Sequence, residues 1–179
     1  RFPNDIVIVA DAHQYLLENY KEFDFIWSSP PCPTHSVTNH FLNSQGIIRF
    51  PDMKLYEEII FLDTFFKGKY VIENVIPYYE PLVPAKKRGR HLYWTNFNLP
   101  NKLSTRIAPN MNCNKNITSK VISGFLEYHE ITDIVSKYKG KQNKGKIARN
   151  LVDYEAGKTI LETVFGIQKK ENINQIEMF

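Results

Sequence analysis

The sequence has few of the residues that define several protein classes. It contains 2 cysteines among 179 residues, too few for a disulfide scaffold, which favours a reducing, cytoplasmic compartment. No stretch reaches the roughly 18 consecutive apolar residues of a membrane-spanning helix. The first residues do not follow the basic-then-apolar pattern of a signal peptide. The first glycine is Gly46, so residues 1–45 hold no glycine-rich phosphate-binding turn.

The chain begins with Arg1 rather than methionine. Together with the late first glycine, this start predicts a piece of a larger protein. The length and the 42% hydrophobic content suffice for one domain with a core, or for one domain and a small appendage. The composition excludes a wholly disordered or collagen-like chain.

Positive charge is concentrated in one part of the chain. Residues 1–100 hold 10 Lys+Arg against 11 Asp+Glu, residues 101–149 hold 10 against 3, and residues 150–179 hold 3 against 5. The balance of +7 in the middle range, 10 against 3, favours contact with a polyanion such as nucleic acid. A solvated, lysine-rich loop region would show the same composition.

Apolar runs alternate with helical patterns through the first hundred residues. The expected strands are residues 6–9, 24–28, 69–73 and 90–94. The expected helices are residues 12–20, 52–66 with Asp52 as N-cap, and 153–165. Residues 33–51 are expected to form a loop, and the pattern fades after residue 97. Strands that alternate with helices predict βαβ units and a parallel sheet.

Unusual residues follow three of these strands. They are Asp11, the Pro30–Cys32 turn, and Glu73 with Asn74. Ligands bind at the carboxyl ends of strands in such sheets, so we expect these residues to share a site. A thiolate at Cys32 would be a strong nucleophile, and a partly desolvated Glu73 would be a usable acid near neutral pH.

Two further patterns bear on the chemistry. Arg88 and Arg90 stand two apart ahead of an apolar run, so in an extended segment both would face one side. The histidines and cysteines have no spacing that suits zinc, so no metal site is expected. Each candidate also has a structural interpretation: a buried cysteine, a solvated strand-end glutamate and a surface arginine pair.

Three strings in order resemble the DNA cytosine-5 methyltransferases of bacterial and phage type: SSPPCPTHS at 28–36, VIENV at 71–75 and RGRHLYW at 88–94. That family has a Pro-Cys nucleophile loop after one strand, Glu-Asn-Val after the next, and Arg-x-Arg before a further strand. The resemblance extends from ADA at 10–12 to RNLV at 149–152 and covers most of residues 5–166. It implies a Rossmann-like α/β fold, S-adenosylmethionine as cofactor, double-stranded DNA as partner and a cytoplasmic location in a bacterial or phage-infected cell.

The resemblance also implies roles for individual residues. Cys32 would add to C6 of a flipped cytosine, Glu73 would protonate the N3 side, and Arg90 would hold the O2 side. The supporting residues of the catalytic site would be Arg88, Pro31 and Asn74. The cofactor-binding residues would be Asp11, Ala12, Pro31, Leu55, Asn150 and Val152. The DNA-binding residues would be Ser36, Lys139, Lys141 and Lys144.

The family pattern divides the chain into four parts: a catalytic α/β core at 1–96, a small, irregular, basic target-recognition region at 97–148, a helix returning to the core at 149–167, and a tail at 168–179. Two family elements are missing, the glycine-rich cofactor turn and the acid that holds the ribose. We expect a missing N-terminal segment or a second polypeptide to supply them. Pro33 stands where many members have glutamine.

Other classes share parts of this pattern. The amino-methyltransferases of adenine N6 and cytosine N4 have Ser-Pro-Pro, but they require an aromatic residue where Cys32 stands. Thymidylate synthase has Pro-Pro-Cys followed by histidine, whereas Pro33 follows here. RNA cytosine-5 methylation uses a different motif arrangement. A catalytically incomplete or split methyltransferase fragment that acts as a DNA-binding module is the alternative favoured by the missing glycine-rich turn.

Overall fold

The computed structural model of the chain describes residues 4–105, 119–128 and 153–167, and single positions at 132, 137, 139, 140, 143, 147 and 151. Its contacts divide it into two compact units, Arg1–Leu99 and Pro100–Phe179. The first unit holds the sheet and every motif from the Pro-Pro-Cys turn to the Arg-x-Arg string. The finer predicted division, with borders at residues 96, 148 and 167, stays a prediction.

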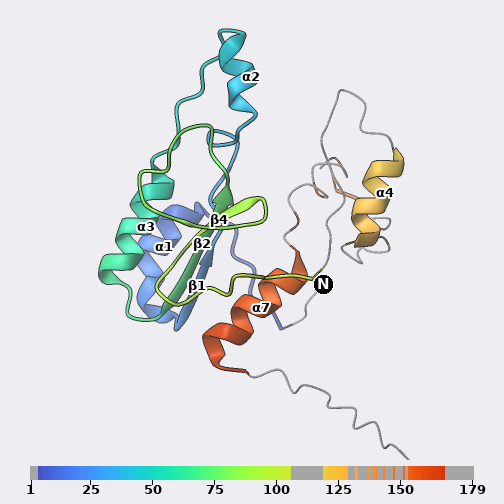
Figure 1. The fold of residues 1–179 in the computed structure, drawn as a ribbon. Coiled ribbons are helices and arrows are strands. Elements are labelled where there is room, and N and C mark those ends of the chain that lie inside the picture. The colour runs from blue at the N-terminus through green and yellow to red at the C-terminus, as the bar shows by residue number, and fades with distance from the viewer. Residues whose placement is uncertain are drawn as a thin grey trace, which may run out of the picture. The chain divides into compact units, whose positions relative to one another are not determined.

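Four strands form one mixed sheet in the first unit (Figure 1). They are β1 (Phe25–Ser28), β2 (Lys69–Val75), β3 (Lys86–Arg88) and β4 (His91–Thr95), in the order β1-β2-β4-β3. β1 and β2 are parallel, whereas β4 is antiparallel to both β2 and β3. The fold class is α/β as predicted, but the expectation of a parallel sheet is right for β1 and β2 alone.

A tight hairpin between β3 and β4 causes the antiparallel pairing. Its turn residues are Gly89 and Arg90, and Gly89 has a φ of +57°, which glycine adopts without strain. A two-residue connection permits only antiparallel strands, because a parallel pair requires a long crossover. Arg88 ends β3 while Arg90 lies in the turn. The prediction that both arginines face one side of an extended segment is therefore wrong.

The helices α1 (Ala12–Asn19) and α3 (Lys54–Phe65) pack against one face of this sheet (Figure 1). A short 3-10 turn, η1 (Tyr20–Glu22), follows α1. Asp11 caps α1, since its Oδ1 accepts from the Gln14 N–H over 3.1 Å. Met53, not the predicted Asp52, is the N-cap of α3, although Asp52 accepts from the Lys54 N–H over 3.1 Å. The shared core contains Leu16, Ile26, Leu55, Tyr56, Ile59, Leu62, Phe66, Tyr70, Ile72, Leu92 and Trp94.

Residues 6–9 do not form the predicted strand. Their side chains are exposed, and within the described residues β1 pairs with β2 alone. β-branched residues favour strands, but a strand also needs a neighbour for its backbone N–H and C=O groups. The predicted loop at 33–51 contains the short helix α2 (Asn39–Ser44).

The second unit contains α4 (Ser119–Tyr128) and α7 (Tyr154–Phe165). α7 agrees with the predicted helix. Asp153 is its N-cap, and Gly166, whose φ is +64°, is its C-cap. The Tyr128 hydroxyl donates to Asp153 over 2.8 Å and so joins the two helices. α4 lies where an irregular region was predicted. In the part of the chain that the structure describes, no helix has the length and apolarity to cross a membrane.

Candidate active site

The loop after β1 is held against the end of β2. Because these strands are parallel, their carboxyl ends lie side by side. The Ser29 hydroxyl donates to Glu73 Oε2 over 2.9 Å, and the Asn74 amide donates to the Pro30 carbonyl over 3.1 Å. The structure thus brings the Pro30–Cys32 turn together with Glu73 and Asn74. This adjacency was predicted from their positions at the ends of expected strands.

Glu73 and Asn74 project to opposite faces of the sheet, because successive strand residues alternate. Asn74 shares its face with Ile72, which packs toward α1 and α3. Glu73 lies on the other face, where 8% of its side chain is exposed. Its second oxygen, Oε1, lies 3.3 Å from Nε2 of His91, the first residue of β4. The buried carboxylate therefore has two side-chain partners, Ser29 and His91.

Cys32 lies half-buried in a tight turn. Its carbonyl accepts from the N–H groups of His35 and Ser36 over 3.0 and 3.1 Å, which stiffens the turn. Burial raises the pKa of the Cys32 thiol, and the nearby negative charge of Glu73 raises it further. The free protein therefore keeps this thiol protonated at neutral pH, and a proton must leave it before it can act as a nucleophile.

A cavity of about 550 Å³ lies at the carboxyl end of β1 and the first turns of α1 and α3. Four of the residues predicted for cofactor binding line it: Asp11, Ala12, Pro31 and Leu55. The structure thus gathers these residues from three separate segments around one cavity. The other two predicted cofactor residues, Asn150 and Val152, lie outside the described residues.

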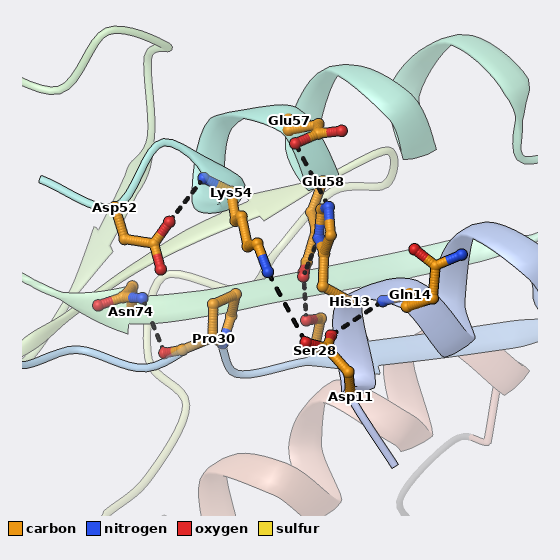
Figure 2. Close-up of polar contacts among 10 residues, drawn as sticks. All are labelled: Asp11, His13, Gln14, Ser28, Pro30, Asp52, Lys54, Glu57, Glu58 and Asn74. Atoms are coloured by element: carbon orange, nitrogen blue, oxygen red, sulfur yellow. Dashed lines mark hydrogen bonds and ion pairs between the residues drawn. The ribbon is translucent and has the colours of Figure 1, made fainter.

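Glu58 on α3 contributes a buried carboxylate to the lining of the cavity. Figure 2 shows its contacts. Glu58 accepts from the Ser28 hydroxyl over 2.6 Å, and its other oxygen lies 3.0 Å from His13 Nδ1. The opposite ring nitrogen of His13 lies 3.3 Å from the exposed Glu57. Sequence reasoning missed Glu58. The available signal was a charged residue three positions after Leu55, on the helix face that is otherwise buried.

His35 is a second cavity residue that sequence reasoning missed, and 1% of it is exposed. Its Nδ1 lies 2.5 Å from the Tyr79 hydroxyl, and its Nε2 has no partner among the described residues. The Leu82 N–H donates to Tyr56 Oη over 3.3 Å, and Tyr56 donates to Tyr79 Oη over the same distance.

These hydrogen bonds connect Tyr56, Tyr79 and His35 in the protein interior. The Tyr56 hydroxyl donates to Tyr79, and His35 Nδ1 accepts from the Tyr79 hydroxyl in one tautomer of the ring and donates to it in the other. Burial lowers the pKa of His35 and keeps its ring neutral, although the charge of Asp52 opposes this.

The other predicted residues are more dispersed. The Arg88 guanidinium donates to the carbonyls of Lys87 and Leu99 over 2.9 and 3.2 Å, and Arg90 is exposed in the hairpin turn. The Ser36 hydroxyl accepts from Thr38, and its backbone pairs with Pro77. Lys139 is exposed in the second unit, whereas Lys141 and Lys144 lie outside the described residues.

Comparison of the chain with family models, with curated proteins and with solved structures finds no match. The geometry combines a half-buried thiol, a buried carboxylate with two partners, and an adjoining cavity lined by a histidine whose Nε2 has no partner among the described residues.

Proposed function

We propose that the protein transfers a methyl group from S-adenosylmethionine to C5 of cytosine in DNA, through a covalent bond between Cys32 and C6 of a flipped base. One observation carries this proposal. The turn that holds Cys32 is bonded to Glu73 and Asn74, directly beside the cavity lined by Asp11, Pro31 and Leu55. A nucleophile, an acid and a ligand cavity are adjacent, and the family motifs occur in the expected order.

The chain's residues divide the chemistry of the base. The Cys32 thiolate forms a bond to C6, and the C5–C6 π electrons become available at C5. Glu73 delivers a proton to N3, which accepts the charge that the addition creates. The bound S-adenosylmethionine supplies the methyl group that C5 takes. A water molecule takes the C5 proton, and the electrons of that C–H bond restore the C5–C6 double bond as the C6–S bond breaks. The Cys32 thiolate is released, and the N3 proton returns to Glu73.

The cavity fits the proposed cofactor in size and chemistry. Its volume of about 550 Å³ is within the range of small-molecule sites. The carboxylates of Asp11 and Glu58 favour a ligand with positive charge, such as a sulfonium or an ammonium group. His35 also lines the cavity, and its buried Nε2, which has no partner among the described residues, adds a polar atom to the lining. Ala12, Pro31 and Leu55 supply apolar contacts for the remainder of the ligand.

Trapping with DNA that contains 5-fluorocytosine tests the proposed chemistry. The fluorine cannot leave C5 as a proton does, so the adduct with the thiol persists. In the presence of S-adenosylmethionine, we expect an adduct with the wild-type chain and with the control variant Cys113→Ala, and none with Cys32→Ala. An adduct that survives Cys32→Ala would contradict the role of Cys32.

A split or incomplete methyltransferase that binds DNA is the second candidate function, and one observation favours it. The apolar residues 6–9 are exposed, and β1 has β2 as its only partner within the described residues. A preceding segment or a second polypeptide that adds strands beside β1 would cover both features. Calorimetric titration with S-adenosylmethionine separates the candidates. Binding by this chain alone supports the complete enzyme, and no heat of binding supports the split form.

A further inference from the structure

The hairpin of β3 and β4 concentrates positive charge in the first unit. Four of the five residues from Lys86 to Arg90 are basic. A charge count over residues 1–100 hides this cluster, because 10 Lys+Arg are balanced there by 11 Asp+Glu. The structure separates the four cations into two that the protein uses internally and two that it leaves exposed.

Lys86 and Arg88 are the internal pair. They stand two apart in β3 and so share one face of the strand. Lys86 Nζ donates to Thr95 Oγ1 and to the Phe97 carbonyl, each over 2.7 Å. The Arg88 guanidinium donates to two backbone carbonyls over 2.9 and 3.2 Å. Both side chains therefore satisfy acceptors of the protein itself.

Lys87 and Arg90 are the exposed pair. Lys87 is on the opposite face of β3 from its two neighbours and pairs with Leu92 in the register. Arg90 lies in the turn. Neither side chain has a hydrogen-bond or ion-pair partner among the described residues. Two uncompensated positive charges at one turn form a surface that suits an anion.

The register of the sheet puts this turn at the same edge as the Cys32 turn. Val75, the last residue of β2, is opposite His91, so the turn that precedes His91 lies beyond the carboxyl end of β2. The Cys32 turn follows β1, which runs parallel to β2 and ends at the same edge. The contact of 3.3 Å between His91 and Glu73 connects the hairpin to the proposed catalytic carboxylate.

We propose that Lys87 and Arg90 bind phosphates of the DNA backbone beside the flipped cytosine, an inference that rests on the proposed function. A cytosine that leaves the duplex stays joined to the phosphates on its two sides, so the backbone must pass the edge of the sheet where Cys32 lies. Exposed lysine and arginine both bind phosphate oxygens. The resemblance implies no role for Lys87 and places Arg90 at the O2 side of the base instead.

The salt dependence of DNA binding tests this proposal. Each phosphate contact contributes about −0.9 to the slope of log K against log salt concentration. The fall in affinity for a labelled duplex between about 50 and about 200 mM salt should therefore be about 3.5-fold smaller in Lys87→Gln or Arg90→Gln than in the wild type, and about 12-fold smaller in the double variant. Fluorescence anisotropy of the full chain titrated into the duplex measures these ratios.

Two further variants separate charge from structure. Lys67→Gln removes an exposed lysine at the amino end of β2, the opposite edge of the sheet, and should keep the wild-type salt dependence. Lys87→Arg keeps the charge and should keep it too. If Lys87→Gln and Arg90→Gln match Lys67→Gln, the hairpin does not bind phosphate. A change in Lys87→Arg as large as in Lys87→Gln would also overturn the role of the charge.

A duplex of A·T pairs alone separates a phosphate contact from a base contact. Phosphate contacts do not depend on sequence, so both glutamine variants should show the same reduced salt dependence on this duplex. If Arg90→Gln changes binding to the cytosine-containing duplex alone, Arg90 contacts the base and its proposed phosphate contact is wrong.

These measurements require no methyl transfer, so the two proposals can fail separately. Unchanged salt dependence in variants of a chain that forms the 5-fluorocytosine adduct overturns the role of the hairpin alone. Reduced salt dependence in variants of a chain that forms no such adduct supports phosphate binding by the hairpin and contradicts the proposed function.

Discussion

The Ser29 hydroxyl donates to Glu73 Oε2 over 2.9 Å, although 44 positions separate the two residues in the chain. The same hydroxyl accepts from the Trp27 indole N–H over 3.0 Å, so its own hydrogen is directed to Glu73. Ser29 thereby joins the end of β1 to the carboxylate on β2. The position of Cys32, three residues further on, depends on this contact.

The reactivity of Cys32 should depend on Glu73. The carboxylate raises the pKa of the thiol, so Glu73→Gln lowers it and increases the thiolate fraction at neutral pH. In a Cys113→Ser background, we expect Glu73→Gln to accelerate alkylation by iodoacetamide a few-fold at pH 7.5. The rates should converge at a pH where both thiols are ionised. Glu80→Gln, an exposed control, should change nothing. Equal rates for Glu73→Gln and the parent would contradict the coupling.

Glu58 and Glu57 are adjacent but should contribute differently to stability. Glu58 is buried and accepts from Ser28 and His13, whereas Glu57 is exposed. Glu58→Ala leaves two polar groups without an acceptor, and we expect the free energy of unfolding to fall by about 2–3 kcal/mol. Glu57→Ala should change it by less than about 0.5 kcal/mol. Urea unfolding of both variants measures the difference, and similar losses would show that Glu58 is not held as described.

The buried His35 should make stability fall in acid. Its pKa in the folded protein is lowered from 6.5, so the unfolded chain binds more protons below that pH. The folded protein keeps this contribution to its stability in full above about pH 6.5. It loses the contribution as the pH falls toward the lower pKa that His35 has in the folded protein. Between pH 7.5 and 5, His35→Gln should lose less stability than the wild type, whereas the exposed His40→Gln should match it. If the free energy of unfolding falls equally with pH in His35→Gln and in the wild type, the pKa of His35 is not lowered in the folded protein.

The same substitution, valine to alanine, can be compared at an exposed position, Val9, and at a buried one, Val71. Val9 is 97% exposed and Val71 is 0% exposed. Val71→Ala removes two buried carbons and should cost about 2 kcal/mol in the free energy of unfolding. Val9→Ala should cost less than about 0.5 kcal/mol. If Val9→Ala costs as much as Val71→Ala, residues 6–9 are packed in the protein, and the predicted strand regains support.

Two glycines should respond to alanine in opposite directions. At Gly68, between α3 and β2, an added Cβ would lie 2.3 Å from the Asp24 carbonyl oxygen and 2.6 Å from the Phe66 ring. Gly68→Ala should therefore destabilise the chain by about 1–3 kcal/mol. Gly157, inside α7, has open space at this position, and Gly157→Ala should stabilise by about 0.5–1 kcal/mol. In thermal melts, an unchanged or raised melting temperature for Gly68→Ala would contradict the packing at Gly68, and a lowered one for Gly157→Ala would contradict the open space in α7.

Local pattern predicted much of the fold. The aromatic and β-branched runs that became β1, β2 and β4, and the helices α1, α3 and α7, were all expected within a few residues. The adjacency of the Cys32 turn and Glu73 followed from two parallel strands in sequence. β3 could not be expected, because an edge strand of three basic residues has no apolar alternation.

The sequence by itself determined which residues carry reactive chemistry and which segments favour strand or helix, because both depend on residue type and short-range spacing. The tertiary structure alone decided which residues contact one another. Residues 6–9 have the composition of a strand but pair with no neighbour among the described residues. Arg88 ends β3, whereas Arg90 lies in the turn that follows it. Glu58, His35 and His91 acquire their significance from burial and from contacts with residues distant in the chain. Burial and long-range contacts arise only when the elements pack, so no local pattern encodes them.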